Sequence, residues 1–197
     1  MRLHALILLE GETEEEFFKA LAEKCLRGVP KTFRNMKGNF NINNKIVDKI
    51  IQFSTEHPDQ EFDVYICVDQ EREGDPIYNK KFVTKEIGDI TTCLEINDVV
   101  ADIMIESLFF IDIDGLYKFL RTPKSARNPK KYLNFRKLTH KDLTTLFRQN
   151  KKMYHKGRRC QSLVENLDLD KIRNTAKEIN FLVMQLKKRY RENNNKS

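Results

Sequence analysis

The segment that decides the fold is the apolar run Leu3-His4-Ala5-Leu6-Ile7-Leu8-Leu9, which is followed at once by Glu10-Gly11. A short and almost continuously apolar run is typical of a strand in a parallel sheet, because such a sheet is buried on both faces. Thr13, with Glu16 three residues later, resembles a helix-capping box, and apolar residues recur at helical spacing over 17–26. The start of the chain therefore predicts a strand, a tight turn and a helix.

The rest of the chain continues this alternation. A second apolar, β-branched run over 62–68 predicts another strand that ends at Asp69. Further patterns predict helices over about 43–55, 77–87, 116–120, 141–148 and 170–189, a strand over 90–96, helical or strongly buried residues from Asp98 onward, and loops over 28–42 and after Arg121. Strands that alternate with helices predict an α/β fold with a largely parallel central sheet flanked by helices.

Size and composition limit the class of protein. A chain of 197 residues fits one domain, and we expect it to be divided into a domain over 1–121 and a basic, mainly helical C-terminal extension over 122–197 that packs on it. An apolar share of 40% with 33% charged residues is typical of a globular protein. The sequence lacks a signal-peptide pattern and an apolar stretch of about 20 residues, so we expect a cytoplasmic protein with no membrane partner.

The cysteines and histidines do not predict a metal site of their own. Cys25, Cys67, Cys93 and Cys160 lie far apart, and three of them have apolar neighbours, which favours reduced thiols in the core. The four histidines do not have the spacing that converging zinc ligands usually require.

Charge is distributed unevenly along the chain. Residues 1–115 hold 13 Lys and Arg against 23 Asp and Glu, a net −10, whereas residues 116–197 hold 23 against 6, a net +17. An acidic metal site and a phosphate-binding surface in one chain would give such an asymmetry. A solvated basic face without a partner is the alternative.

Carboxylates follow two of the predicted strands directly. Glu10 and Asp69 are each the first acidic residue after a buried run, and Glu71 lies two positions beyond Asp69. Because ligands bind beyond the carboxyl ends of parallel strands, these side chains are candidates to hold Mg²⁺ (or Mn²⁺) beside a phosphate. Gly11, which has no Cβ, would let the phosphate approach the turn. On spacing alone, Glu10 and Asp69 can also be ordinary residues at the ends of strands.

Other acidic residues have competing interpretations. Glu14 lies in the first turn of a predicted helix, where the helix dipole favours a carboxylate whatever its function. Asp75 precedes Pro76 and is more typical of a turn. Glu106 lies inside an apolar run, so it is either exposed or paired, because an unpaired buried carboxylate is costly.

Three segments resemble, in order, motifs of Toprim-like domains of the overcoming-lysogenization-defect type and of their small stand-alone bacterial relatives. Residues 6–14 resemble the opening Glu-Gly-x-Thr-Glu motif, and residues 64–71 resemble an apolar strand that ends in Asp-x-Asp. Residues 105–112 are similar to a Glu-x-Trp-Leu-x-x-Asp stretch of the stand-alone relatives. The resemblance covers about residues 3–121, and the basic remainder matches only loosely.

This resemblance implies a Toprim or Rossmann-like catalytic domain with Mg²⁺-dependent phosphodiesterase or nuclease activity, often encoded beside an ATPase in phage-defence modules. It implies that Glu10 is a metal-site or general acid/base residue, that Asp69 and Glu71 are metal ligands, and that Glu14 is an accessory. Two residues depart from the pattern. Glu71 replaces the second Asp, which lengthens that ligand, and Leu108 stands where the family tends to have Trp.

The leading hypothesis is a metal-dependent nuclease that acts on DNA or RNA, as the effector of a phage-defence or toxin-like system, with Gly11, Asp75 and Glu106 as accessory residues. Its expected phosphate contacts are basic residues of the C-terminal extension: Lys130, Lys131, Lys151, Lys152, Lys156, Arg158 and Arg159. The interleaved aromatic residues Tyr132, Phe135 and Tyr154 either stack on bases or, as is more usual, pack in the fold.

Two other classes of function stay open. The domain can be a regulatory module without activity that binds nucleic acid or a partner ATPase through its basic half. It can also be a phosphatase for small molecules or a nucleotide-binding domain, which would show no salt-sensitive affinity for long nucleic acid. The oligomeric state is open, and a homodimer is among the options.

Overall fold

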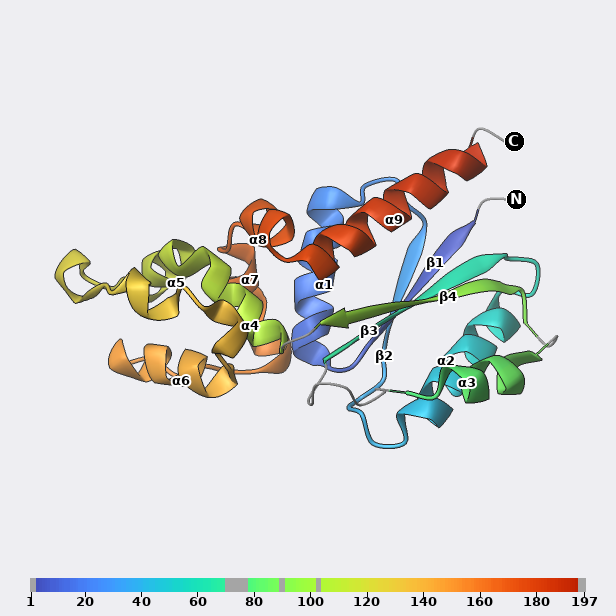
Figure 1. Cartoon of the computed structure of the whole chain (residues 1–197), viewed down its shortest axis with the longest axis horizontal. Helices are drawn as coiled ribbons and strands as arrows, with labels where there is room; N and C mark the ends of the chain where they lie inside the picture. The colour runs from blue at the N-terminus through green and yellow to red at the C-terminus, as the bar shows by residue number, and fades with distance from the viewer. Residues whose placement is uncertain (1–2, 70–77, 89–90, 102–103, 195–197) are drawn as a thin grey trace.

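A four-stranded parallel sheet with the strand order β2-β1-β3-β4 organises the chain (Figure 1). We describe it from a computed structural model, which covers residues 3–69, 78–88, 91–101 and 104–194. The strands are β1 (His4–Leu9), β2 (Lys31–Asn35), β3 (Phe62–Asp69) and β4 (Cys93–Ala101). The predicted α/β class with a parallel central sheet is therefore confirmed.

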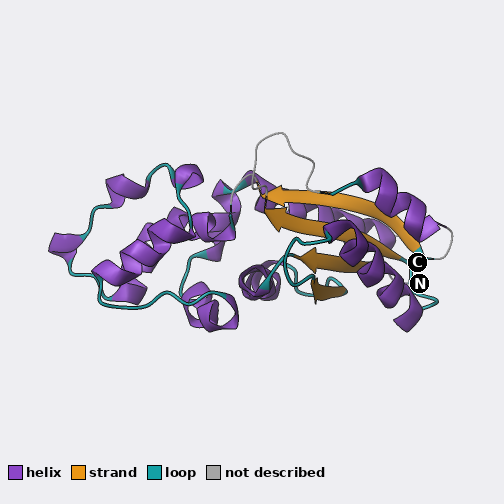
Figure 2. Cartoon of the chain, turned by 90° about the horizontal axis from the view of Figure 1, so that it is seen from below, coloured by secondary structure: helices purple, strands orange, loops and turns teal. Residues whose placement is uncertain are grey.

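Helices cover both faces of this sheet (Figure 2). On one face lie α1 (Glu12–Cys25) and α9 (Lys177–Asn194), and on the other lie α2 (Ile42–Glu56) and α3 (Lys80–Ile87). The alternation of side chains along the strands explains the two layers, because Ile7 and Tyr65 point into the core beneath α1 and α9, while Leu8 and Ile66 point into the core beneath α2 and α3.

A helical lobe stands at the carboxyl ends of the strands, where the arrowheads point in Figures 1 and 2. It comprises α4 (Ile105–Phe109), α5 (Ile113–Leu120), α6 (His140–Gln149), α7 (Gln161–Glu165) and α8 (Leu169–Thr175), with short 3-10 turns between them. One apolar cluster joins the lobe to the sheet, since Leu9 and Phe17 belong to the same buried group as Leu143 and Phe147. Residues on both sides of the expected boundary at residue 121 therefore share a core.

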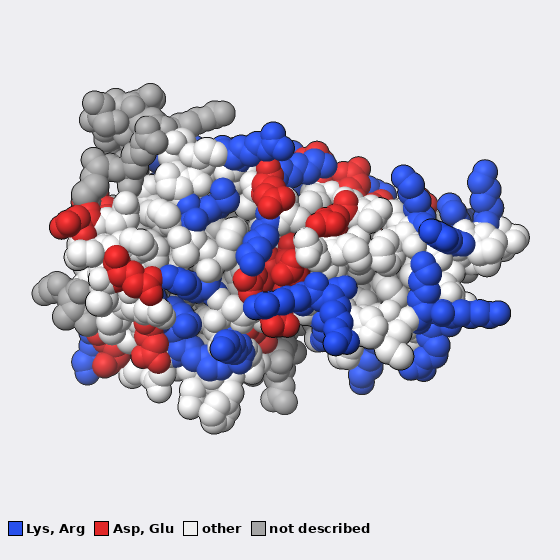
Figure 3. Space-filling view, turned by 180° about the vertical axis from the view of Figure 1, so that it is seen from behind, with Lys and Arg blue, Asp and Glu red and all other residues white. Residues whose placement is uncertain are grey.

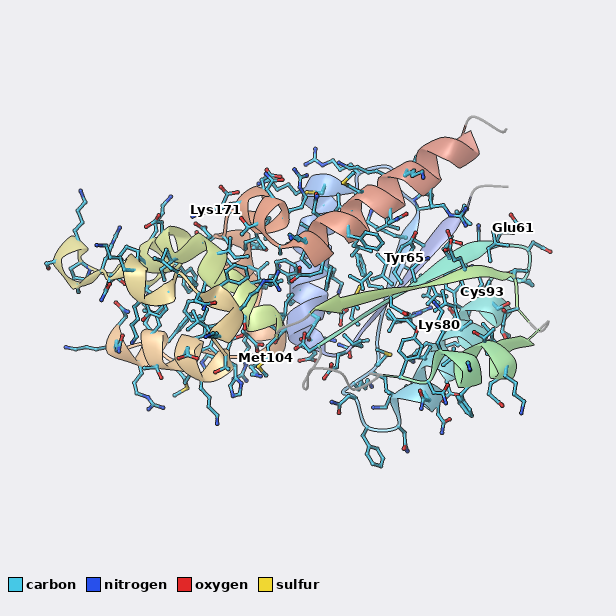
Figure 4. All side chains as sticks on the ribbon, viewed as in Figure 1. Glu61, Tyr65, Lys80, Cys93, Met104 and Lys171 are labelled. Atoms are coloured by element: carbon cyan, nitrogen blue, oxygen red, sulfur yellow. The ribbon has the colours of Figure 1, made fainter. Side chains whose placement is uncertain are left out.

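Helix α9 returns from the lobe and lies along the sheet. Tyr65 of β3 lies beneath it (Figure 4), and Leu182 and Leu186 of α9 belong to the same apolar cluster as Tyr65. Arg189 holds the buried Asp63 of β3 through two hydrogen bonds, with its Nε 2.9 Å from Oδ2 and its Nη2 3.2 Å from Oδ1. The end of the chain is thereby anchored to the strand that carries Asp69.

One prediction about the strands is wrong. Residues 28–42, predicted to be a loop, contain the edge strand β2, whose sequence Lys-Thr-Phe-Arg-Asn lacks the apolar pattern of a buried strand. The segment from Asp98 to Ala101, expected to be helical or strongly buried, continues β4 in register with Ile66 to Asp69 of β3, and Val99 is buried there. Both segments are strands because they pair with a neighbouring strand, and such pairing cannot be predicted from the local sequence pattern.

Two predictions about helix ends are also wrong. Gly11, not Thr13, is the N-cap of α1, and no side chain caps this helix, so the capping box is absent. The helix expected from Asp170 is two helices, α8 and α9, which are separated at the extended Ala176. The side chain of Asp168 caps α8.

Among the helices that the structure describes, none has the length and apolar character that a membrane-spanning helix needs. Cys25, Cys67 and Cys160 are buried.

Candidate carboxylate site

The parallel pairing of β1 with β3 brings Glu10 and Asp69 to adjacent strand ends. Leu9, the last residue of β1, is the register partner of Cys67, so Glu10 follows β1 beside the last two residues of β3, Val68 and Asp69. The backbone N–H of Asp69 donates a hydrogen bond to Oε2 of Glu10 over 3.4 Å. The two carboxylates that the sequence places after separate strands therefore lie at one edge of the sheet.

Glu14 joins this edge from the first turn of α1. Gly11 precedes the helix in an extended conformation, and a Cβ added to it would lie 2.9 Å from Oε2 of Glu14. The Glu14 carboxylate is therefore folded back over the turn between β1 and α1, in the space that a larger residue at position 11 would take. Gly11 is needed here for the close approach of a side chain.

Glu106 reaches the same region from α4. It is 2% exposed, its Oε1 lies 3.1 Å from Nζ of Lys156, and it accepts a longer hydrogen bond of 3.4 Å from the hydroxyl of Tyr154. The sequence left Glu106 either exposed or paired, and the structure places it as a buried, paired carboxylate. The N–H of Gly157, next to Lys156, donates to Oγ1 of Thr13 over 2.9 Å, which fastens this segment to α1.

Two of these carboxylates, Asp69 and Glu14, have raised pKa values. Burial raises the pKa of Asp69 to about 8, and the nearby charges of Glu14, Glu10 and Glu106 raise it as well. Burial also raises the pKa of Glu14 to about 7, with Glu106 and Glu10 acting in the same direction and Lys156 against them. Negative groups that raise each other's pKa in this way would be relieved by a cation among them.

The donor set at this edge fits a hard divalent cation better than zinc. The strand-end residues Glu10 and Asp69 offer carboxylate oxygens there, and Mg²⁺ is typically held by one or two carboxylates while it keeps several waters. Within the described ranges no three His, Cys, Asp or Glu side chains form a group that could hold a metal ion. A pair such as Glu10 and Asp69 with waters completing the coordination matches the chemistry of Mg²⁺ or Mn²⁺. Glu71 and Asp75 lie outside the described residues.

The basic residues proposed to contact nucleic acid fall into two groups. Lys156 lies against Glu106, and Arg158 lies 3.6 Å from Glu12 in the first turn of α1, so these two and the exposed neighbour Arg159 lie close to the carboxylates. Lys130 and Lys131 are exposed on a 3-10 turn over 129–132, which Figure 1 places far from the sheet. Lys151 and Lys152 follow α6, and Lys152 donates to the carbonyl of Phe119 in α5 over 3.0 Å.

Figure 3 shows how charged side chains are distributed over one face of the molecule. Lys and Arg side chains gather at the end of the molecule that the lobe forms, while Asp and Glu side chains lie over the middle and the sheet half. The aromatic residues of the lobe have packing roles. Tyr132 is buried against Phe110 with ring centroids 5.1 Å apart, and Tyr154 packs on Phe147 at 5.3 Å.

One acidic residue near the site was missed by the sequence predictions. Glu178, in the first turn of α9, lines a small cavity together with Glu14 and Asp69. Its place at the start of a helix is the signal that could have drawn attention to it. That signal was hidden, because the expected helix from Asp170 ran through this position without a break.

Comparison with known proteins gives one match. The model of the family described as "Domain of unknown function (DUF4276)" matches residues 9–187, which include every carboxylate named above. No curated protein and no solved structure matches the chain significantly.

Proposed function

Because this chain belongs to the DUF4276 family, a domain of unknown function, we propose its function from the site itself: it is a Mg²⁺-dependent nuclease that hydrolyses phosphodiester bonds of DNA or RNA. The observation that carries the proposal is the convergence of Glu10, Glu14, Asp69 and Glu106 at the carboxyl end of a parallel sheet. These residues come from three separate parts of the chain, and the resemblance to Toprim-like nucleases rests on the same positions.

The residues of the site would have different roles in metal binding, proton transfer and phosphate binding. Glu10 and Asp69 would hold the cation, which supplies polarisation of a phosphoryl oxygen and an activated water when it is bound. Glu14, with a pKa of about 7, is suited to accept or release a proton at its carboxylate near neutral pH. Lys156 holds its ammonium beside Glu106, where it can also attract a phosphate oxygen.

The basic lobe supplies the surface that the substrate needs. The lobe holds most of the Lys and Arg residues of the segment over 116–197, whose net charge of +17 favours a polyanion, and Arg158 and Arg159 continue this charge to the edge of the carboxylate site. Lys130, Lys131, Lys151 and Lys152 would hold more distant phosphates of a long substrate. Such a division favours long nucleic acid over a small phosphate ester. A role as the effector of a phage-defence system, with a partner ATPase, belongs to the same proposal.

The test is cleavage of plasmid, single-stranded DNA and structured RNA with Mg²⁺ or Mn²⁺. The wild-type chain is compared with Glu10→Ala, Asp69→Ala and the control Glu23→Ala, which removes an exposed carboxylate from the other end of α1. We expect cleavage by wild type and by the control, and a loss of at least about 100-fold in the two site variants. Equal cleavage by all four proteins would indicate a contaminant and contradict the proposal.

Binding of nucleic acid without cleavage would favour the second candidate, a regulatory module with no activity. The separation of Lys130 and Lys131 from the carboxylates is the observation that favours this candidate, since part of the basic surface is placed to act without the site. Salt-sensitive binding that is unchanged in Asp69→Ala, with no product on any substrate, would support it.

A further inference from the structure

The small cavity at the edge of the sheet is bounded by both halves of the chain. Glu14 and Asp69 face it from the sheet side, Ile105 faces it from α4, and Glu178 and Ile179 face it from α9. The remaining walls are formed by Phe18, Cys67, Val68 and Val99. Helix α9 therefore brings a carboxylate from the C-terminal extension to the same space as two of the candidate site residues.

The two oxygens of Glu178 differ in their surroundings. Its side chain is 10% exposed, and Oε2 lies 3.3 Å from Nη2 of Arg136. Oε1 is buried, and no group in the described part of the chain donates a hydrogen bond to it. Arg136 thus fixes the carboxylate in place while one of its oxygens has no partner.

A buried carboxylate oxygen without a partner is uncommon, because its desolvation costs free energy that a hydrogen bond normally offsets. The missing partner must be a donor or a cation. A cation binds Glu14 and Asp69 in their ionised form, in which they only accept hydrogen bonds, while Cys67 offers the cavity no more than a weakly donating thiol and its other walls are apolar. A ligand that enters from the carboxylate side is the remaining source, and a cation or the water bound to it has the required character.

We propose that Glu178 is part of the metal site, and that its Oε1 accepts a hydrogen bond from a water bound to the divalent cation held at Glu10 and Asp69. This inference rests on the proposed function. Contact through a water suits Mg²⁺ and Mn²⁺, because such ions keep several waters when carboxylates bind them. Partners of this kind orient the bound water, and their loss typically weakens metal binding about 10–100-fold.

The consequence is that the C-terminal extension completes the site. The salt bridge between Arg136 and Glu178 joins the lobe to α9, and α9 delivers Glu178 to the end of β3. Glu178 is accordingly a positioning residue that acts on the cation through a water.

The experiment is calorimetric titration of the full chain with Mn²⁺. Wild type is compared with Glu178→Gln, Glu178→Asp, Asp69→Asn and the matched control Glu165→Gln, which changes an exposed glutamate of α7. We expect Glu178→Gln and Glu178→Asp to bind Mn²⁺ about tenfold more weakly than wild type, and Glu165→Gln to bind it equally. Without Mn²⁺ the melting temperature of Glu178→Gln should stay close to that of wild type, because an amide oxygen can still accept from Arg136; a merely structural role of the carboxylate would not allow this.

The outcomes separate the two proposals. If wild type binds Mn²⁺ and Asp69→Asn does not, while both Glu178 variants bind it as wild type does, the role of Glu178 is overturned and the proposed function stands. If the Glu178 variants lose stability without Mn²⁺ and their Mn²⁺ affinity is unchanged, the residue is structural and the inference is again overturned. Wild type that binds no Mn²⁺ overturns the metal site and this inference together.

Discussion

Asp69 and Glu14 make the stability of the protein depend on pH. Burial and the neighbouring carboxylates raise their pKa values to about 8 and about 7, above the ordinary values of 3.8 and 4.5. The folded protein therefore binds these protons more tightly than the unfolded chain does. The stability that results is fully present below about pH 4 and is lost as the pH rises through about 7 to 8.

We predict that the metal-free protein becomes less stable between about pH 6 and pH 9, and that Asp69→Asn reduces this loss by at least about 1 kcal/mol, or roughly 2–4 °C in melting temperature. Thermal melts across this range measure it. Saturating Mn²⁺ should reverse the trend in wild type, because a cation binds the ionised carboxylates. Parallel curves for wild type and variant would show that Asp69 ionises normally.

A substitution of Gly11 is predicted to change Mn²⁺ affinity by displacing the side chain of Glu14. A Cβ at position 11 would meet Oε2 of Glu14 at 2.9 Å, and this oxygen is the far end of a side chain that can move. Gly11→Ala should therefore leave the fold intact, displace the Glu14 carboxylate and weaken Mn²⁺ binding about tenfold. Calorimetric titration with Mn²⁺ measures the effect.

The control for Gly11 is a double-mutant cycle. In a Glu14→Gln background the added methyl group of Gly11→Ala should cause little further loss of Mn²⁺ affinity, because its target is already changed. The same loss with and without Glu14 would mean that Gly11 acts on its own.

The location of a site residue could be predicted from the sequence where a charged residue directly follows a buried apolar strand. Glu10 and Asp69 follow such strands, and their neighbourhood is decided by the parallel pairing of β1 with β3. Glu178 could not be found in this way. Its approach to the site depends on the break at Ala176 and on the path of α9 across the sheet, which are consequences of tertiary packing.

Helix α9 is predicted to depend on Arg189 for its docking, through ion pairs with Asp63 of β3 and with the exposed Glu95 of β4. Asp63 is 1% exposed, and Arg189 satisfies both of its oxygens. Arg189→Ala would leave a buried carboxylate without its partner and should destabilise the protein by about 3 kcal/mol, near the low end for buried pairs because Arg189 is partly exposed. Urea unfolding measures the change.

Lys177→Ala is the matched control, because it removes an exposed cation from the same helix. It should change the stability by less than about 0.5 kcal/mol. Similar small effects for Arg189→Ala and Lys177→Ala would mean that apolar packing alone docks α9.

Whole elements were predicted well where their apolar pattern is strong. Strands β1 and β3 and helices α1 and α2 lie close to the expected ranges, because each buries a face that its own sequence displays. Strand β2 was missed because its side chains are only partly buried, so its Lys and Arg residues cause no penalty at the edge of the sheet. The type of element at the end of β4 could not be assigned from the sequence, because an apolar run is compatible with either a strand or a buried helix.

The opposite charges of the two parts of the chain predict which part would contact nucleic acid, if the proposed function holds. If the lobe holds phosphates, replacing Lys130 and Lys131 together by Ala should weaken binding to every sequence and reduce the slope of log affinity against log salt by about 2. Mn²⁺ affinity should not change, because these residues lie far from the carboxylates. Fluorescence anisotropy at several salt concentrations measures the slope.

Replacing Lys81 and Lys85 by Ala is the control for this experiment, because both are exposed lysines of α3, a helix that does not belong to the lobe. It should leave the slope unchanged. Equal slopes for both double variants and wild type would mean that the lobe does not contact phosphates at residues 130 and 131.

The proposed metal site requires that carboxylates from separate strands hold a divalent cation at one edge of the sheet. Anomalous diffraction from a crystal of the protein soaked in Mn²⁺ would show whether they do. We predict an anomalous peak between Glu10 and Asp69, with carboxylate oxygens about 2.0–2.2 Å from the ion. No peak at this position at saturating Mn²⁺, or a peak only elsewhere in the molecule, would contradict the claim.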